Sequence, residues 1–248
     1  MALLLPVAER DVVEAQILVG LLYYRGSETV SPDYTKAFAW FQRAAKQNHP
    51  GAQYNLAVLY ADGTGVAQNY AEAAKWYQIA AEAGYSDAMV NLAYLYKNGL
   101  GVSQDNEQAL KLYREAAELK NRMAFAGLGD MYAKGLGVPK DPSEALKYYR
   151  LAVEHGILRI AGVLGYAYET GTSGVAQDYV EAYKWYTIGE REIENASLLT
   201  AQPGFAPEGA QLLSLLISRK YEVLKGIMTA EEIVEGEERA RQWRPSAP

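Results

Sequence analysis

Apolar residues recur at intervals of three and four along most of the chain, with polar residues between them. From Ala52 to Tyr60, and again from Ala73 to Ala80, this spacing is the period of an amphipathic α-helix. Both runs are too short to be stable alone, so each must bury its apolar face against the other. The pattern therefore predicts a pair of short helices joined by a loop.

The same helix pair recurs along the chain with a fixed spacing. Three copies place identical residue types 36 positions apart without a gap. The matched positions of the clearest copy are Ala52, Leu56, Tyr60, Gly63, Gly65, Val66, Ala73, Tyr77 and Ala80. One less regular copy precedes these three and another follows, each with one extra residue in its loop. The chain is thus predicted to be an all-α solenoid of five helix-loop-helix repeats of about 36 residues.

Residues with special backbone roles predict where the helices end. A glycine closes each first helix of repeats two to five, where a left-handed residue is needed. These glycines are Gly63, Gly99, Gly135 and Gly171. Each second helix of these repeats opens with a capping Asn or Asp three residues before a Glu or Gln. These capping residues are Asn69, Asp105, Asp141 and Asp178.

The pattern loosens at both ends of the repeats. We predict an N-terminal segment over residues 1–14, repeats over 15–199, a linker over 200–207, and capping helices with a tail over 208–248. Within the last segment, one apolar helix is expected from about Glu208 to Leu224. Thr229 with Glu232 then starts a final helix that runs to about Trp243. Its charged face would cover the end of the solenoid, where no further repeat follows.

The N-terminal end has an apolar edge formed by Leu3, Leu4 and Leu5. We expect this edge to pack on Leu18 and Leu22. The alternative is that it forms a self-association surface.

Composition narrows the classes of partner. Half of the residues are apolar and 22% are charged, which is typical of a folded chain. The net charge is −6 and no long basic run occurs, so binding to nucleic acid or anionic lipid is not expected. There is no transmembrane span and no basic region like that of a secretory signal at the start. A cytoplasmic location is therefore favoured, or a periplasmic one if the chain is processed.

No residue pattern indicates catalysis, a cofactor or a metal. The chain has no cysteine, which excludes thiolate chemistry and disulfides. His49 and His155 are about one hundred residues apart and are interpreted as surface or cap residues. The Gly-x-Gly loops lack the third glycine and the preceding strand of a dinucleotide site, so they are interpreted as turns. We predict that the protein is not an enzyme.

The repeat resembles the Sel1-like repeat, a relative of the tetratricopeptide repeat. The resemblance rests on Leu-Ala or Leu-Gly followed by Tyr, on the Gly-x-Gly-Val loop, and on Ala-x-x-Trp-Tyr-x-x-Ala-Ala in the second helix, over residues 15–195. It implies a right-handed superhelix whose concave wall is lined by the first helices, and a role as adaptor or scaffold. A cysteine-rich branch of the family binds or slowly hydrolyses β-lactams and binds peptidoglycan-like ligands, and the absence of cysteine departs from that branch.

Candidate binding residues are first-helix positions that vary between repeats and are expected to point away from the second helix. Stepping by one repeat places them in three rows, with neighbouring helices about 8–10 Å apart. The predicted contact residues are Ile17, Leu21, Tyr24, Tyr54, Val58, Val90, Tyr94, Lys97, Asp130, Tyr166 and Glu169. Tyrosine is favoured at interfaces, and Lys97, Asp130 and Glu169 would set the register.

The predicted function is a non-enzymatic interaction module that captures another protein or a peptide in its concave face. An immunity or chaperone-like protein for a bacterial toxin or effector is a special case. One alternative is a periplasmic binder of peptidoglycan fragments or β-lactams with weak hydrolase activity. Another is that these side chains only cover the groove.

Overall fold

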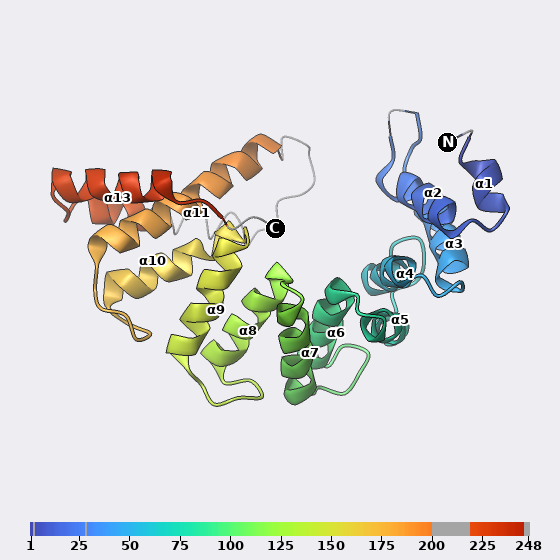
Figure 1. Cartoon of the computed structure of the whole chain (residues 1–248), viewed down its shortest axis with the longest axis horizontal. Coiled ribbons are helices and arrows are strands. Elements are labelled where there is room, and N and C mark those ends of the chain that lie inside the picture. The colour runs from blue at the N-terminus through green and yellow to red at the C-terminus, as the bar shows by residue number, and fades with distance from the viewer. Residues whose placement is uncertain (2, 28, 200–218, 246–248) are drawn as a thin grey trace. The chain divides into compact units, whose positions relative to one another are not determined.

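The computed structural model of the chain is a series of α-helices joined by short loops (Figure 1). It describes residues 1, 3–27, 29–199 and 219–245, with all side chains of these except those of residues 192–199. The chain divides into two compact units, Met1–Asn121 and Arg122–Pro248. Each unit has apolar core clusters of its own. The all-α prediction is confirmed.

The first unit contains a short N-terminal helix followed by three helix pairs. Its helices are α1 (Leu5–Glu9), α2 (Val13–Arg25), α3 (Tyr34–Ala45), α4 (Pro50–Asp62), α5 (Tyr70–Glu82), α6 (Ser86–Asn98) and α7 (Asn106–Glu118). The two helices of each pair pack on each other, and the pairs are connected by packing of α3 on α4 and of α5 on α6. This is the nearest-neighbour packing of a helical solenoid.

The second unit contains two further pairs and a C-terminal helix. Its elements are α8 (Arg122–Lys134), α9 (Pro142–Glu154), the 3₁₀ turn η1 (Leu158–Ile160), α10 (Ala161–Thr170), α11 (Tyr179–Leu199) and α13 (Ala230–Gln242). Residues 219–225 are also helical. In the fifth repeat, η1 takes the place of the first turn, so α10 has 10 residues whereas α8 has 13.

The helix ends form where the sequence predicts them. Gly63, Gly99 and Gly171 adopt φ values of +70°, +66° and +63° at the ends of α4, α6 and α10. The loop then returns, and the N–H of Asn69 donates to the Tyr60 carbonyl at 2.8 Å. The same bond recurs at the equivalent positions of the next three repeats. The loops of repeats two to five are therefore closed by the same backbone hydrogen bond.

Each capping side chain also acts as predicted. The carboxamide or carboxylate of Asn69, Asp105, Asp141 and Asp178 accepts a hydrogen bond from the backbone N–H three residues later, at 2.9–3.1 Å. The following glutamate has a different role from the one that a capping box gives it. Glu72, Glu144 and Glu181 pair with the lysines one turn further on, Lys75, Lys147 and Lys184, at 2.5–2.7 Å. The reciprocal box forms at Thr229 and Glu232 in α13.

Small residues of the first helix lie under aromatic rings of the second. A Cβ added at Gly129 would lie 2.5 Å from the Tyr149 ring, and one added at Gly165 would lie 2.7 Å from the Tyr186 ring. This close approach sets the direction of the rings. Their hydroxyl groups consequently reach the first helix of the same repeat, where the candidate site lies.

The second glycine of each loop is needed for contact with the preceding repeat. Gly101 has a φ of +68°, and a Cβ there would lie 2.3 Å from the Tyr70 carbonyl carbon at the start of α5. A Cβ added at Gly65 would likewise lie 2.2 Å from the Tyr34 carbonyl oxygen at the start of α3. These close contacts account for the glycines as packing residues, in agreement with their interpretation as turns.

The N-terminal segment packs differently from the prediction. Leu4 and Leu5 lie against a small cluster that contains Ala15 and Val19 of α2. Leu18 remains 49% exposed, and neither Leu18 nor Leu22 is among the residues that pack on this cluster. The expected contact with Leu18 is therefore wrong, and Leu3 is 88% exposed.

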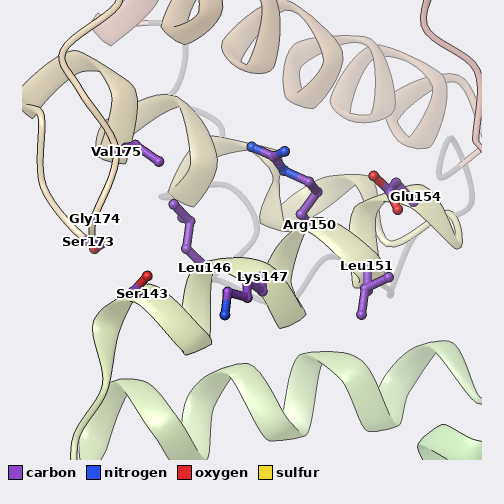
Figure 2. Close-up of a pocket in the computed structure, with 9 residues that line it drawn as sticks. All are labelled: Ser143, Leu146, Lys147, Arg150, Leu151, Glu154, Ser173, Gly174 and Val175. Carbon is purple, nitrogen blue, oxygen red and sulfur yellow. The ribbon is translucent and has the colours of Figure 1, made fainter.

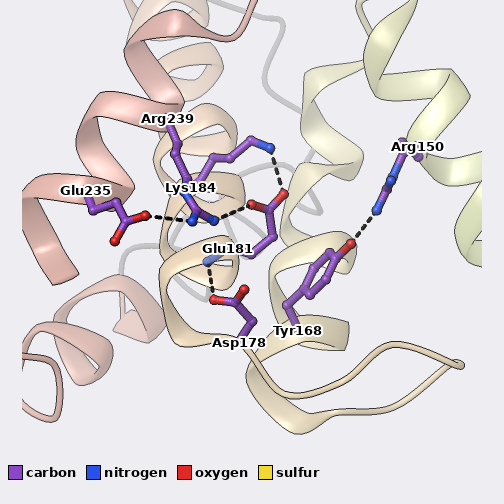
Figure 3. A network of polar contacts seen from close by, with 7 residues as sticks. All are labelled: Arg150, Tyr168, Asp178, Glu181, Lys184, Glu235 and Arg239. Carbon is purple, nitrogen blue, oxygen red and sulfur yellow. Dashed lines mark hydrogen bonds and ion pairs between the residues drawn. The ribbon is translucent and has the colours of Figure 1, made fainter.

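The C-terminal helix packs on the fifth repeat. Figure 1 shows α13 beside α11, and the rings of Trp243 and Trp185 meet edge to face at 6.1 Å. Arg239 joins α13 to α11 by an ion pair with Glu181 at 3.2 Å, and pairs within α13 with Glu235 at 2.7 Å (Figure 3). The final helix thus begins and ends close to its predicted limits. The predicted linker over 200–207 and the start of the helix expected at Glu208 lie outside the described residues.

Candidate partner-binding surface

The eleven predicted contact residues, which we call the first-helix surface, are divided between the two units. Those of the first unit lie on α2, α4 and α6, and those of the second on α8 and α10. The most exposed are Tyr94 on α6 and Tyr166 on α10, with exposed fractions of 50% and 52%. These two residues occupy the same position of the repeat.

The three predicted contact residues of α2 are partly buried against the core of the first unit. Ile17, Leu21 and Tyr24 pack against the cluster that contains Phe41 and Leu56. Tyr24 also meets Tyr34 edge to face, with ring centroids 5.7 Å apart. The first repeat therefore offers half-buried side chains, which stabilise the unit as well as forming its surface.

The second and third repeats form an aromatic patch with a polar edge. The Tyr54 ring lies between those of Tyr77 and Tyr85, at 5.9 and 5.1 Å. The Asn91 amide donates to the Tyr77 hydroxyl at 3.1 Å. Burial is the main cause of the raised pKa values of Tyr54 and Tyr77, so both hydroxyls stay protonated at neutral pH. Val58, on α4, is half-buried.

Two residues of this patch were missed by the sequence prediction. Tyr85 precedes α6 and Asn91 lies within it, next to the predicted and half-buried Val90. The sequence feature that could have indicated Tyr85 is its position at the junction between two repeats, where the residue type differs from repeat to repeat. The Asn91 bond has no such signal, because it depends on the packing of α6 against α5.

The predicted charged residues already have partners. Lys97 places its Nζ 5.5 Å from the Tyr94 ring centroid. Asp130 accepts a hydrogen bond from the Tyr149 hydroxyl at 2.9 Å, and Glu169 accepts one from Tyr186 at 2.7 Å. Burial, reinforced by the bonded carboxylates, raises the pKa values of both tyrosines. Both carboxylates are consequently fixed in direction.

The chain's own C-terminal segment covers part of the surface at α10. The Lys220 ammonium forms an ion pair with Glu169 at 2.8 Å and lies 5.5 Å from the Tyr166 ring centroid. Glu169 is left with 14% of its side chain exposed. A partner that binds the fifth repeat at Glu169 would therefore have to contact Lys220 or displace it.

The histidines have the structural roles expected from the sequence. His49 caps α4 by accepting from the Ala52 N–H at 3.3 Å, and His155 stacks on Phe125 with ring centroids 5.1 Å apart. Within the described ranges, no group of histidine and carboxylate side chains could hold a metal ion. In the same part of the chain, no helix has the length and apolar character to cross a membrane.

Together these features define a tandem helical-repeat protein with a mixed aromatic and charged surface on its first helices. The Sel1 repeat model matches residues 13–49, 50–85, 86–121, 123–157 and 163–189. The chain therefore belongs to the Sel1 repeat family, which confirms the resemblance and the number of repeats.

Solved structures of Sel1 repeat proteins are similar to the chain. The Escherichia coli protein c5321, a protective antigen of uropathogenic strains, matches with a TM-score of 0.73 and 29% identity, over 97% of this chain and 55% of that one. A Sel1 repeat protein from Oxalobacter formigenes has a TM-score of 0.68 and 33% identity, over 83% and 84% of the two chains. The immunity protein Pa5087 from Pseudomonas aeruginosa shares the fold with a TM-score of 0.50 and 20% identity, over 86% and 81%.

The chain spans about half of c5321 and much less of a curated plant relative. That relative is the Arabidopsis thaliana ERAD-associated E3 ubiquitin-protein ligase component HRD3B, which is 46% identical over 48 residues. The match covers 19% of this chain and 8% of the plant protein. It is a match between short stretches of two much larger sequences.

Proposed function

We propose that the chain is a non-enzymatic interaction module that holds another protein or a peptide on its first-helix surface. The observation that carries the proposal is the pair of half-exposed tyrosines, Tyr94 and Tyr166, at equivalent positions of two repeats. Interfaces favour large aromatic side chains as anchors. Each of these tyrosines has a lysine ammonium near its ring, Lys97 at Tyr94 and Lys220 at Tyr166, which gives both anchors a positively charged neighbour.

Membership of the Sel1 repeat family supports a binding role. The special case of an immunity or chaperone-like protein rests on a shared fold with the Pseudomonas immunity protein. It predicts a toxin or effector gene beside the gene for this chain, which inspection of the gene neighbourhood would test.

Affinity capture from the source cells, followed by mass spectrometry, tests the proposal. The test variant changes Tyr94 and Tyr166 together to Ala, because both side chains are half-exposed and can be shortened with little loss of packing. The control changes Ile79 of α5 and Leu119, which follows α7, to Ala. These apolar residues are similarly exposed, at 42% and 54%, but belong to second helices.

We expect the wild type and the control to retain the same partner and the tyrosine variant to lose it. Equal retention by all three proteins would contradict a role for the first-helix surface. A thermal shift with muropeptides or β-lactams, without any captured protein, would contradict the class of partner.

A further inference from the structure

A depression of about 440 Å³ lies between α9 and the loop that follows α10 (Figure 2). Leu146, Leu151 and Val175 give it an apolar lining. Leu146 and Val175 also belong to a core cluster of the second unit, so this wall is rigidly supported. The volume is in the range of small-molecule sites.

An arginine without a carboxylate partner faces this apolar wall. In Figure 2, Arg150 and Leu146 leave the same side of α9. Among the described residues, the guanidinium of Arg150 has one hydrogen-bond partner, the Tyr168 hydroxyl, and no carboxylate within 4.0 Å (Figure 3). The Tyr168 contact fixes the direction of the guanidinium and leaves most of its N–H donors available.

The other charges of the depression limit what it can hold. Lys147 is paired with Glu144 at 2.6 Å, so its charge is largely compensated. Glu154 leaves α9 one turn beyond Arg150 and adds a negative charge to the rim. The Arg150 guanidinium, which has no carboxylate of the described residues in contact, can bind one carboxylate group, and Glu154 disfavours any further negative charge on the ligand.

The loop that closes the depression is one residue longer than the loops of the three regular repeats. It contains the extra residue between Gly171 and Gly174, and Ser173 adopts a left-handed φ of +58°. Non-glycine residues in this conformation store strain and cluster at functional sites. The following Gly174 lies against Ser143 of α9, since a Cβ there would be 2.8 Å from the Ser143 Oγ. The insertion thus forms one end of the depression.

We propose that this depression is a binding site for a small monoanion that joins a carboxylate to a short branched aliphatic group. The carboxylate would accept two hydrogen bonds from the Arg150 guanidinium, which matches its planar fork. The aliphatic group would lie on Leu146 and Val175. This site is formed by the second helix α9 and is separate from the first-helix surface, so either proposal can fail without the other.

The probe is isocaproate, titrated into the full chain with methyl-labelled leucine and valine and followed by NMR. Its neutral isostere isocaproamide has the same aliphatic group without the charge. A third ligand, an N-acetylated tripeptide that ends in leucine with a free C-terminus, separates a free acid from a peptide end as the source of the carboxylate. The variants are Arg150→Gln and Arg150→Lys. The control Lys75→Gln removes a positive charge from the second helix of the second repeat.

We expect saturable shifts of the Leu146 and Val175 methyl groups with isocaproate, and affinity about tenfold or more weaker for isocaproamide and for Arg150→Gln. Arg150→Lys should fall between these and the wild type, and Lys75→Gln should bind as the wild type does. Equal affinity for isocaproate and isocaproamide, or no shift of these methyl groups, would overturn the proposal. If Arg150→Gln does not fold, the comparison of the two ligands on the wild type still decides.

Discussion

At the scale of single residues, identical types in the repeat have distinct tasks set by their surroundings. The tyrosines at positions 77, 149 and 186 lie in second helices, and their hydroxyls bond to polar side chains of first helices. Tyr94 and Tyr166 belong to the first helices themselves and are half-exposed. The side chain is the same, and the helix face decides whether it supports the fold or can contact a partner.

A comparison of Gly101 with Gly84 distinguishes the free-energy cost of a left-handed backbone from the cost of close packing. Both have positive φ values, but a Cβ at Gly84 would have no heavy atom within 4 Å, whereas one at Gly101 would lie 2.3 Å from backbone. We expect Gly84→Ala to lower the free energy of unfolding by about 1 kcal/mol and Gly101→Ala by about 3 kcal/mol or more. Urea unfolding of both variants checks this, and equal losses would contradict the packing role.

At the scale of elements, the sequence predicts those features that depend on interactions between residues close together in the chain. The helix limits, the capping side chains and the closing glycines are all visible as short-range patterns, and the structure has them in place. The η1 turn before α10, the pairing of Glu72 with Lys75 and the position of Leu18 were not foreseen. Glu72 had two local options, the capping box and the pair with Lys75, whereas η1 packs on α9 and α11, which no local pattern indicates.

Contacts at the α10 part of the first-helix surface were likewise not predictable from local sequence patterns. Glu169 was predicted to set the register of a partner, and Lys220 pairs with it from 51 residues further along the chain. No local pattern around Glu169 indicates this contact. The loop insertion between Gly171 and Gly174 was visible in the repeat spacing, although the depression that it helps to form was not.

The contact of Lys220 with α10 predicts a measurable contribution to stability. Lys220→Ala would leave the Glu169 carboxylate, with 14% of its side chain exposed, bonded to Tyr186 alone. We expect the free energy of unfolding to fall by about 1–2 kcal/mol. The control Lys111→Ala removes a looser pair with Glu115, at 3.9 Å between more exposed side chains, and should change little. Matching urea midpoints for the two variants would argue against this role of the C-terminal segment.

At the scale of the whole molecule, the division into two compact units makes a prediction about folding. Each unit has its own core, and repeats of this kind are stabilised mainly by their nearest neighbours. A fragment of residues 1–121 should therefore fold alone, with a helical circular dichroism spectrum and a cooperative urea transition. An unfolded spectrum for this fragment would show that the first three repeats depend on the rest of the chain.

The central claim is that the first-helix surface holds a protein partner. Its most direct test is the affinity of the purified partner for the wild type, Tyr94→Ala and Ile79→Ala, measured by calorimetry. We expect Tyr94→Ala to bind about tenfold or more weakly than the wild type, because an aromatic anchor is lost, and Ile79→Ala to bind equally well. Unchanged affinity of Tyr94→Ala together with weaker binding of Ile79→Ala would contradict the claim and place the partner on the second helices.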